Sequence, residues 1–112
     1  MKDEINYSIS DYEGLKVIKL EGNISNSTRI DFEKLINDIT QKSNVILNMN
    51  DVGVITSGGF HSLAGISAEA RKRNKRVMIM GLREGLANMM ETMGVIHYFT
   101  FVGSVEEALS RI

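Results

Sequence analysis

The chain of 112 residues contains no cysteine, no proline and no tryptophan. The absence of cysteine excludes disulfide bonds, thiol catalysis and cysteine-ligated metal sites. No apolar run approaches the roughly 20 residues that a transmembrane helix requires. The opening segment, MKDEINYSIS, is charged and lacks the apolar centre of a signal peptide. We therefore expect a cytoplasmic protein that does not associate with a membrane.

An excess of charge of one sign is missing as well. Lys and Arg together number 13 and Asp and Glu 14, which gives a formal net charge of −1. A dedicated nucleic-acid-binding protein is usually clearly basic, so no nucleic-acid partner is expected. The basic run at residues 71–76 is interpreted as cations at a helix C-terminus that Asn74 ends, and contact with an anion is the alternative. His61 and His97 lack metal-ligand spacing, so neither a metal nor a cofactor is expected.

Apolar residues follow strand-like and helix-like patterns in alternation along the whole chain. The patterns predict strands over 5–9, 15–20, 45–49, 77–80 and 98–102, and helices over about 28–42, 60–73, 86–93 and 104–112. Residues 11–14, DYEG, are expected to join the first two strands as a hairpin. This alternation predicts a single α/β domain over residues 1–112, with a mostly parallel sheet covered by helices.

Individual residues predict where some elements begin and end. Thr28 and Asp31 have the spacing of a capping box at the start of the first helix. Ser104 and Glu107 have the same spacing at the start of the final helix. Gly22 is expected to end the second strand.

Residues 56–59, TSGG, lie between a predicted central strand and the helix that follows. Ligands of open α/β sheets usually bind at this carboxyl end of a strand, and the unpaired N–H groups of a helix start favour negative charge. A phosphate attached to Ser57, or brought by a ligand, would be stabilised there. The competing interpretation is that a hydroxyl caps the helix and Gly59 permits a tight turn. No Lys-Ser/Thr follows, so the segment is not a nucleotide-binding P-loop, and Phe60 is expected in the core.

Residues 45–60 resemble the signature of STAS domains, in which an apolar strand precedes a hydrophobic-Asp-Ser-Ser/Thr-Gly-hydrophobic motif that opens a helix. Gly22-Asn23-Ile24 resembles the family's Gly-x-hydrophobic turn before its first helix. Residues 102–109, VGSVEEAL, are similar to its final Ser-x-Glu-Glu-Ala-Leu. The resemblance covers nearly the whole chain. It implies a mixed central sheet of about five strands, with about four helices largely on one side.

Small free-standing members of the family are typically bacterial anti-sigma factor antagonists. Such an antagonist binds an anti-sigma factor that is also a serine kinase of the GHKL type. The kinase phosphorylates the first Ser of the motif, phosphorylation breaks the complex, and a serine phosphatase restores it. The resemblance therefore implies a transcription-regulating binding protein without enzymatic activity, phosphorylated at Ser57. The expected partner-binding residues surround that position: Ser25, Thr56, Ser57, Gly58, Gly59 and His61.

The chain departs from the family motif at three positions. Thr56 stands in place of the usual Asp, Gly58 in place of the second Ser/Thr, and Ser25 in place of an acidic residue. Losing carboxylates removes repulsion against a phosphate, and it also removes any help they give in presenting Ser57 to a kinase. Two alternatives follow: a STAS domain that binds its partner without phosphorylation, and a module for a nucleotide or lipid in a signalling or transport complex. A hydrolase is disfavoured, because Ser57 has no base at a recognisable spacing and no Gly-x-Ser-x-Gly motif.

Overall fold

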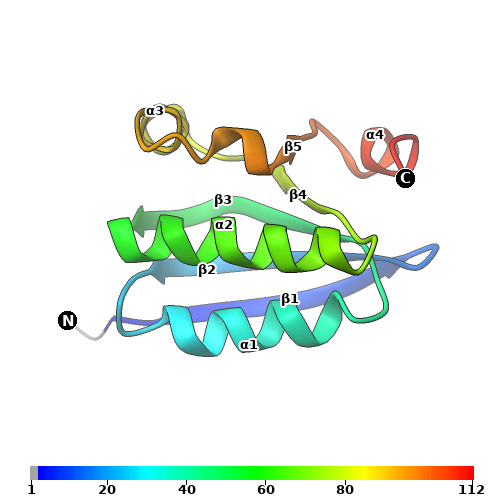
Figure 1. The fold of residues 1–112 in the computed structure, drawn as a ribbon, viewed down its shortest axis with the longest axis horizontal. Helices are drawn as coiled ribbons and strands as arrows, with labels where there is room; N and C mark the ends of the chain where they lie inside the picture. Colours follow the sequence, from blue (N-terminus) through cyan, green and yellow to red (C-terminus); the bar gives the residue numbers. More distant parts are fainter. Residues whose placement is uncertain (1–2) are drawn as a thin grey trace.

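A computed structural model describes residues 3–112 as a five-stranded sheet with strand order β1-β2-β3-β4-β5. The strands are β1 (Ile5–Tyr12), β2 (Leu15–Ile24), β3 (Val45–Ile55), β4 (Val77–Met80) and β5 (Thr100–Phe101). The helices are α1 (Arg29–Ile39), α2 (Ser57–Lys72), α3 (Glu84–Thr92), the 3₁₀ turn η1 (Ile96–Tyr98) and α4 (Val105–Leu109). Strand β1 is antiparallel to β2 and the other pairs are parallel, so the predicted mixed α/β sheet is confirmed (Figure 1).

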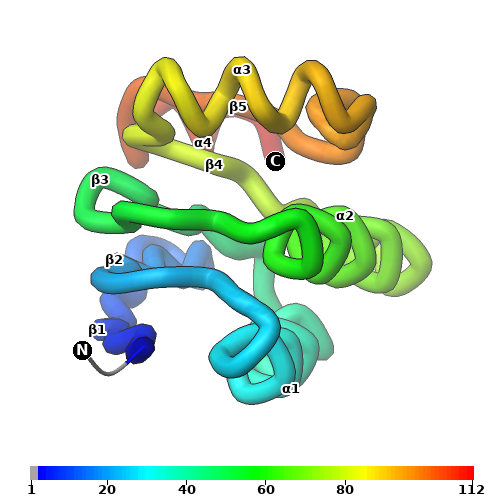
Figure 2. Tube along the Cα trace, turned by 90° about the vertical axis from the view of Figure 1, so that its left-hand side faces the viewer, coloured from blue at the N-terminus to red at the C-terminus, as the bar shows by residue number. Residues whose placement is uncertain are grey.

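The helices cover the two faces of the sheet unequally. Helices α1 and α2 lie side by side against one face (Figure 2), and α3 joins the same apolar cluster through Leu86 and Met90. The opposite face buries a smaller cluster, to which α4 contributes Ala108. Phe60 is fully buried in the larger cluster, as the sequence predicts. The prediction that helices lie largely on one side is therefore confirmed.

The hairpin between β1 and β2 forms at the predicted turn. Tyr12 pairs with Leu15, which leaves Glu13 and Gly14 as a two-residue loop. Both loop residues have positive φ, 55° and 88°, as a type I′ turn requires. The Asp11 side chain accepts a hydrogen bond of 2.9 Å from the N–H of Gly14. The turn therefore holds β1 antiparallel to β2, and β1 is the first strand in the order of the sheet.

Two central strands run further than the sequence predicts. Strand β2 continues through Gly22 to Ile24, so the prediction that Gly22 ends it is wrong. Strand β3 likewise continues to Ile55. The reason is pairing between the two strands, which is maintained past two register shifts up to Ile24 opposite Ile55. Ladder hydrogen bonds between neighbouring strands outweigh the low strand propensity of a glycine.

The predicted capping box at the start of α1 is also wrong. The Thr28 side chain makes no capping hydrogen bond to the helix. Its hydroxyl instead accepts from the N–H of Ser25 at 2.9 Å and donates to the carbonyl oxygen of Asn23 at 2.8 Å. The capping bond at the start of α4 does form, because the N–H of Glu107 donates to the Ser104 hydroxyl at 3.1 Å.

Several predicted boundaries shift by a few residues. Helix α1 ends at Ile39 rather than about 42, and α4 ends at Leu109 rather than at the C-terminus. Tyr98 belongs to η1, so the last strand is shorter than the predicted 98–102, because this segment turns to bury Val95 and Phe99. Helix α2 ends before Asn74, whose φ of 61° confirms the predicted left-handed residue. No helix within residues 3–112 is long and apolar enough to cross a lipid bilayer.

Candidate partner-binding site

Ser57 is the first residue of α2, directly after the carboxyl end of β3. Helix α2 begins here, rather than near Phe60, because the Thr56 hydroxyl accepts a hydrogen bond of 3.1 Å from the N–H of Gly59. The capping role therefore belongs to Thr56. The Ser57 side chain is exposed, and its hydroxyl makes no hydrogen bond to another residue within 3–112. This hydroxyl is free to meet a partner.

Two glycines let the start of α2 approach the turn between β2 and α1. A Cβ added at Gly59 would overlap the carbonyl oxygen of Ile24, well inside the 3.0 Å below which real Cβ contacts do not occur. The same oxygen accepts a hydrogen bond of 3.0 Å from the N–H of Thr56. A Cβ at Gly58 would overlap the side-chain oxygen of Asn26. The turn that precedes α1 thus packs directly beside Ser57.

Ser25 lies in that turn, where the family motif has an acidic residue. Its side chain is buried, and its hydroxyl donates to the carboxylate of Asp3. The same carboxylate accepts from the Ser27 hydroxyl at 2.6 Å and from the Asn23 side-chain amide at 3.1 Å. Asp3 therefore supplies the turn with the negative charge that Ser25 lacks. Hydrogen bonds from Ser25, then Ser27 and then Asn23, hold the pKa of Asp3 below its ordinary value.

This lowered pKa predicts an acid-dependent contribution of Asp3 to folding. A carboxyl whose pKa is lower in the folded chain stabilises the fold above the unfolded pKa, and that contribution is lost as the pH falls through the folded pKa. We expect Asp3→Asn to lower the free energy of unfolding at pH 7 and to have progressively less effect below the ordinary pKa of 3.8. Urea denaturation at pH 7, 4 and 2.5 measures the difference. Glu91→Gln, at an exposed position of α3, is the matched control.

A cation lies close to the start of α2. The side chain of Arg29 passes the helix start, with Cδ 3.7 Å from the position that a Cβ at Gly58 would take. Its guanidinium contacts the carboxylate of Glu33 at 3.5 Å, and Glu33 also accepts a hydrogen bond from Ser62 of α2. His61, one turn after Ser57 in α2, is exposed. The helix start therefore carries partial positive charge at Ser57, and the Arg29–Glu33 ion pair lies beside the neighbouring Gly58.

The predicted site residues gather at one end of the sheet but differ in exposure. Ser57 and His61 are exposed, Thr56 and Gly58 are half-buried, and Ser25 and Gly59 are buried. A partner can therefore touch the exposed members, while the buried members hold the helix start in place. Sequence reasoning missed three further residues that border this surface: Asp3, Asn26 and Arg29. No local pattern marks them, because each reaches the site through contacts between distant segments.

The STAS domain model matches residues 6–108 of the chain. The chain therefore belongs to the STAS domain family. No curated protein matches it in sequence.

Solved structures confirm the fold across nearly the whole chain. An anti-sigma factor antagonist from Mycobacterium paratuberculosis is 18% identical with a TM-score of 0.82, over 100% of this chain and 97% of that chain. The anti-sigma factor antagonist SpoIIAA of Bacillus, in its phosphorylated form, is 16% identical with a TM-score of 0.69, over 95% of this chain and 98% of that chain. The murine anion transporter Slc26a9 is 16% identical with a TM-score of 0.77, over 91% of this chain but 18% of the transporter.

Proposed function

We propose that this protein is an anti-sigma factor antagonist that acts by partner switching in the cytoplasm. In this proposal, the unmodified protein binds an anti-sigma factor serine kinase of the GHKL type through the start of α2. The kinase phosphorylates Ser57 and releases the antagonist, and a serine phosphatase removes the phosphate. The observation that carries the proposal is the free, exposed hydroxyl of Ser57 at the N-terminus of α2.

The division of roles between Thr56 and Ser57 supports this proposal. If Ser57 were the helix cap, a phosphate on its oxygen would remove a bond that holds α2. Because Thr56 accepts the capping bond from Gly59, Ser57 can be modified without loss of the cap. The similar structures include an antagonist in a phosphorylated form, which makes the same modification a natural expectation for this chain.

The electrostatics of the helix start explain how phosphorylation would switch binding. A phosphoserine carries a charge of about −1.5 to −2 at neutral pH. In the free protein this charge lies beside the first N–H groups of α2, which stabilise it, and the Arg29 side chain passes nearby at Gly58. In a complex the partner covers the same surface, so the phosphate would lose its hydrating water molecules. It would also contact partner groups that fit a neutral hydroxyl. Phosphorylation therefore raises the free energy of the complex relative to the free protein, and the complex dissociates.

The three departures from the family motif are compatible with this mechanism. Asp3 brings a carboxylate to the turn that contains Ser25, so the site keeps a negative charge. Gly58 leaves room for Asn26, which a larger residue would have to displace. Thr56 keeps a capping oxygen at the position of the usual Asp. Each change preserves the architecture around Ser57.

Affinity capture from a lysate of the native cells tests the proposal. The baits are the unmodified protein, Ser57→Glu and the control Ser110→Glu, which adds the same charge at an exposed position after α4. Each bait is incubated with ATP or with ADP, and retained proteins are identified by mass spectrometry. We expect a GHKL-type kinase to be retained by the unmodified bait and by Ser110→Glu, and to be lost from Ser57→Glu.

Equal retention by all three baits would overturn the switch. The better account would then be a STAS module that binds a partner or a small ligand without phosphorylation, as in a signalling or transport complex.

A further inference from the structure

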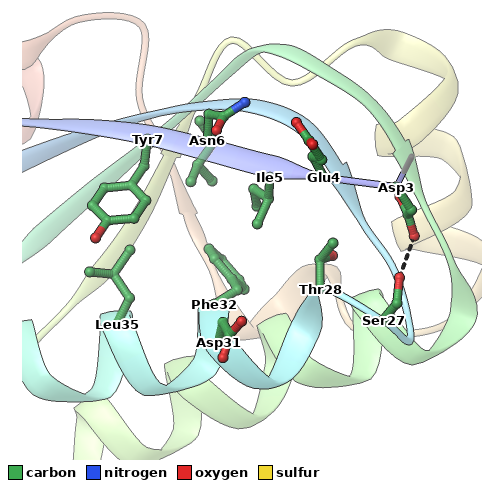
Figure 3. A pocket seen from close by; sticks show the side chains of 11 residues that line it. Asp3, Glu4, Ile5, Asn6, Tyr7, Ser27, Thr28, Asp31, Phe32 and Leu35 are labelled. Atoms are coloured by element: carbon green, nitrogen blue, oxygen red, sulfur yellow. Dashed lines mark hydrogen bonds between the residues drawn. The ribbon is translucent and has the colours of Figure 1, made fainter. Parts of the chain in front are cut away.

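A groove lies between the edge strand β1 and helix α1, apart from the Ser57 hydroxyl (Figure 3). It has a volume of about 460 Å³. Its floor is apolar and is formed by Ile5, Leu20, Phe32 and Leu35. The carboxylates of Asp3 and Asp31 border it on the α1 side, whereas the Glu4 side chain points to the opposite face of β1 (Figure 3).

The backbone beside this groove has unused hydrogen-bonding groups. The carbonyl oxygen of Glu4 accepts from Asn23 of β2 at 2.9 Å, so Glu4 directs its backbone groups toward β2. In an antiparallel ladder this direction alternates along the strand. Ile5, Tyr7 and Ile9 therefore direct their N–H and C=O groups away from the sheet. No described strand pairs with this edge, because β1 is the end of the five-stranded order within residues 3–112.

The side chains of Ile5 and Tyr7 line the groove, and that of Ile9 lies on the same face of the sheet. Tyr7 lies opposite Leu20 and Ile9 opposite Ile18, which places both on the helix-covered face. They are nevertheless 54% and 46% exposed, because α1 does not reach over the edge of the sheet. A long edge strand with exposed apolar side chains, and without proline, is a template for pairing with another strand.

We propose that this edge binds an extended peptide segment of another protein as an added strand along β1, in which every second residue faces the groove and these residues are apolar except for one cation. The backbone of the segment would pair with Ile5, Tyr7 and Ile9. Every second side chain of a strand added to this edge points toward α1. The apolar side chains of the segment would therefore enter the groove between β1 and α1. The cation, on the same side of the added strand, would meet Asp3 and Asp31 where they border the groove.

Charge complementarity selects this occupant over a second copy of the chain. Asp3, Glu4 and Asp31 form no salt bridge with any cation of the described residues. Two β1 strands paired antiparallel about Ser8 would instead place Asp3 of one copy opposite Glu13 of the other. Like charges directly opposite each other are destabilising, so the acidic edge opposes self-pairing and attracts a basic strand.

Titration of the ¹⁵N-labelled protein with three synthetic peptides tests this proposal. The first is a seven-residue peptide with lysine at position 1 and valine at positions 3, 5 and 7, separated by threonine. The second replaces the lysine with glutamate, and the third carries a central proline in the lysine peptide. We expect the first to bind with a Kd of about 100 μM and the other two at least about tenfold more weakly. On binding, the amides of Ile5, Tyr7 and Ile9 should gain protection from hydrogen exchange.

Charge-reversal variants separate the groove from general electrostatic attraction. Asp31→Lys, at the border of the groove, should weaken binding of the lysine peptide about tenfold and strengthen binding of the glutamate peptide. Glu91→Lys, which makes the same change of charge at an exposed position of α3, should leave both unchanged. Equal effects of the two variants, binding without protection of the β1 amides, or a dimer of the free protein paired through β1 would each overturn the proposal. Ser57→Glu should not alter peptide binding, so the result is independent of the proposed switch.

Discussion

Gly59→Ala is expected to lower the free energy of unfolding by about 2–3 kcal/mol, a typical cost of forcing extra volume into a packed site. The added Cβ would overlap the carbonyl oxygen of Ile24, which is a backbone atom of a central strand. That oxygen already accepts the N–H of Thr56, so any movement also disturbs the start of α2. Urea denaturation followed by far-ultraviolet circular dichroism measures the change, since the chain has no tryptophan.

Two other glycines of α2 serve as matched controls. At Gly58 the added Cβ meets the end of the Asn26 side chain, which can rotate away, so Gly58→Ala should change stability by less than about 0.5 kcal/mol. At Gly65 no atom lies within 4 Å, and Gly65→Ala should stabilise the helix by about 0.5–1 kcal/mol. If Gly59→Ala changed the free energy of unfolding as little as Gly58→Ala, the start of α2 would not lie as close to the Ile24 carbonyl oxygen as described.

The second large effect concerns the affinity for the captured kinase. Ser57→Glu should weaken binding about 100-fold, which corresponds to about 2.7 kcal/mol, because it places a charge in the covered surface at the start of α2. Ser57→Ala should change the affinity less than about threefold, because the Ser57 hydroxyl is not the helix cap and the methyl group keeps the surface neutral. Calorimetric titration of the purified kinase with each variant provides both values.

Ser110→Glu is the control for net charge and should bind as the unmodified protein does. A similar loss of affinity for Ser57→Ala and Ser57→Glu would mean that the hydroxyl itself makes the contact. A loss with Ser110→Glu as well would mean that overall charge, rather than position, controls binding. Either result would contradict a switch that acts through negative charge at Ser57.

The elements that the sequence predicts well are those whose apolar period is determined locally. The run from Val77 to Met80 is predicted and observed as the same strand, because all four residues are apolar and Gly81 follows at a φ of 75°. The capping of α4 by Ser104 depends on residues three apart and is likewise found as predicted. Local spacing is sufficient where the partners are neighbours in sequence.

Sequence reasoning fails where a residue's partner is distant. Thr28 has the spacing of a helix cap, but its hydroxyl is used by Ser25 and Asn23 in the preceding turn. Asp3 looks like part of a charged N-terminal segment, yet it bonds to Ser25, 22 residues away. Arg29 reaches the α2 start only because α1 and α2 pack together. Such contacts depend on the tertiary fold, and one sequence carries no pattern that reports them.

Phosphopeptide mapping of the protein, isolated from its native cells across growth conditions, shows directly whether Ser57 is phosphorylated. The account predicts a single phosphorylated residue, Ser57, whose occupancy changes between conditions while Ser25, Ser27 and Thr56 remain unmodified. Ser57 should also be phosphorylated when the purified protein is incubated with the captured kinase and ATP. Absence of phosphate from Ser57 under every condition, with the kinase active, would contradict the account.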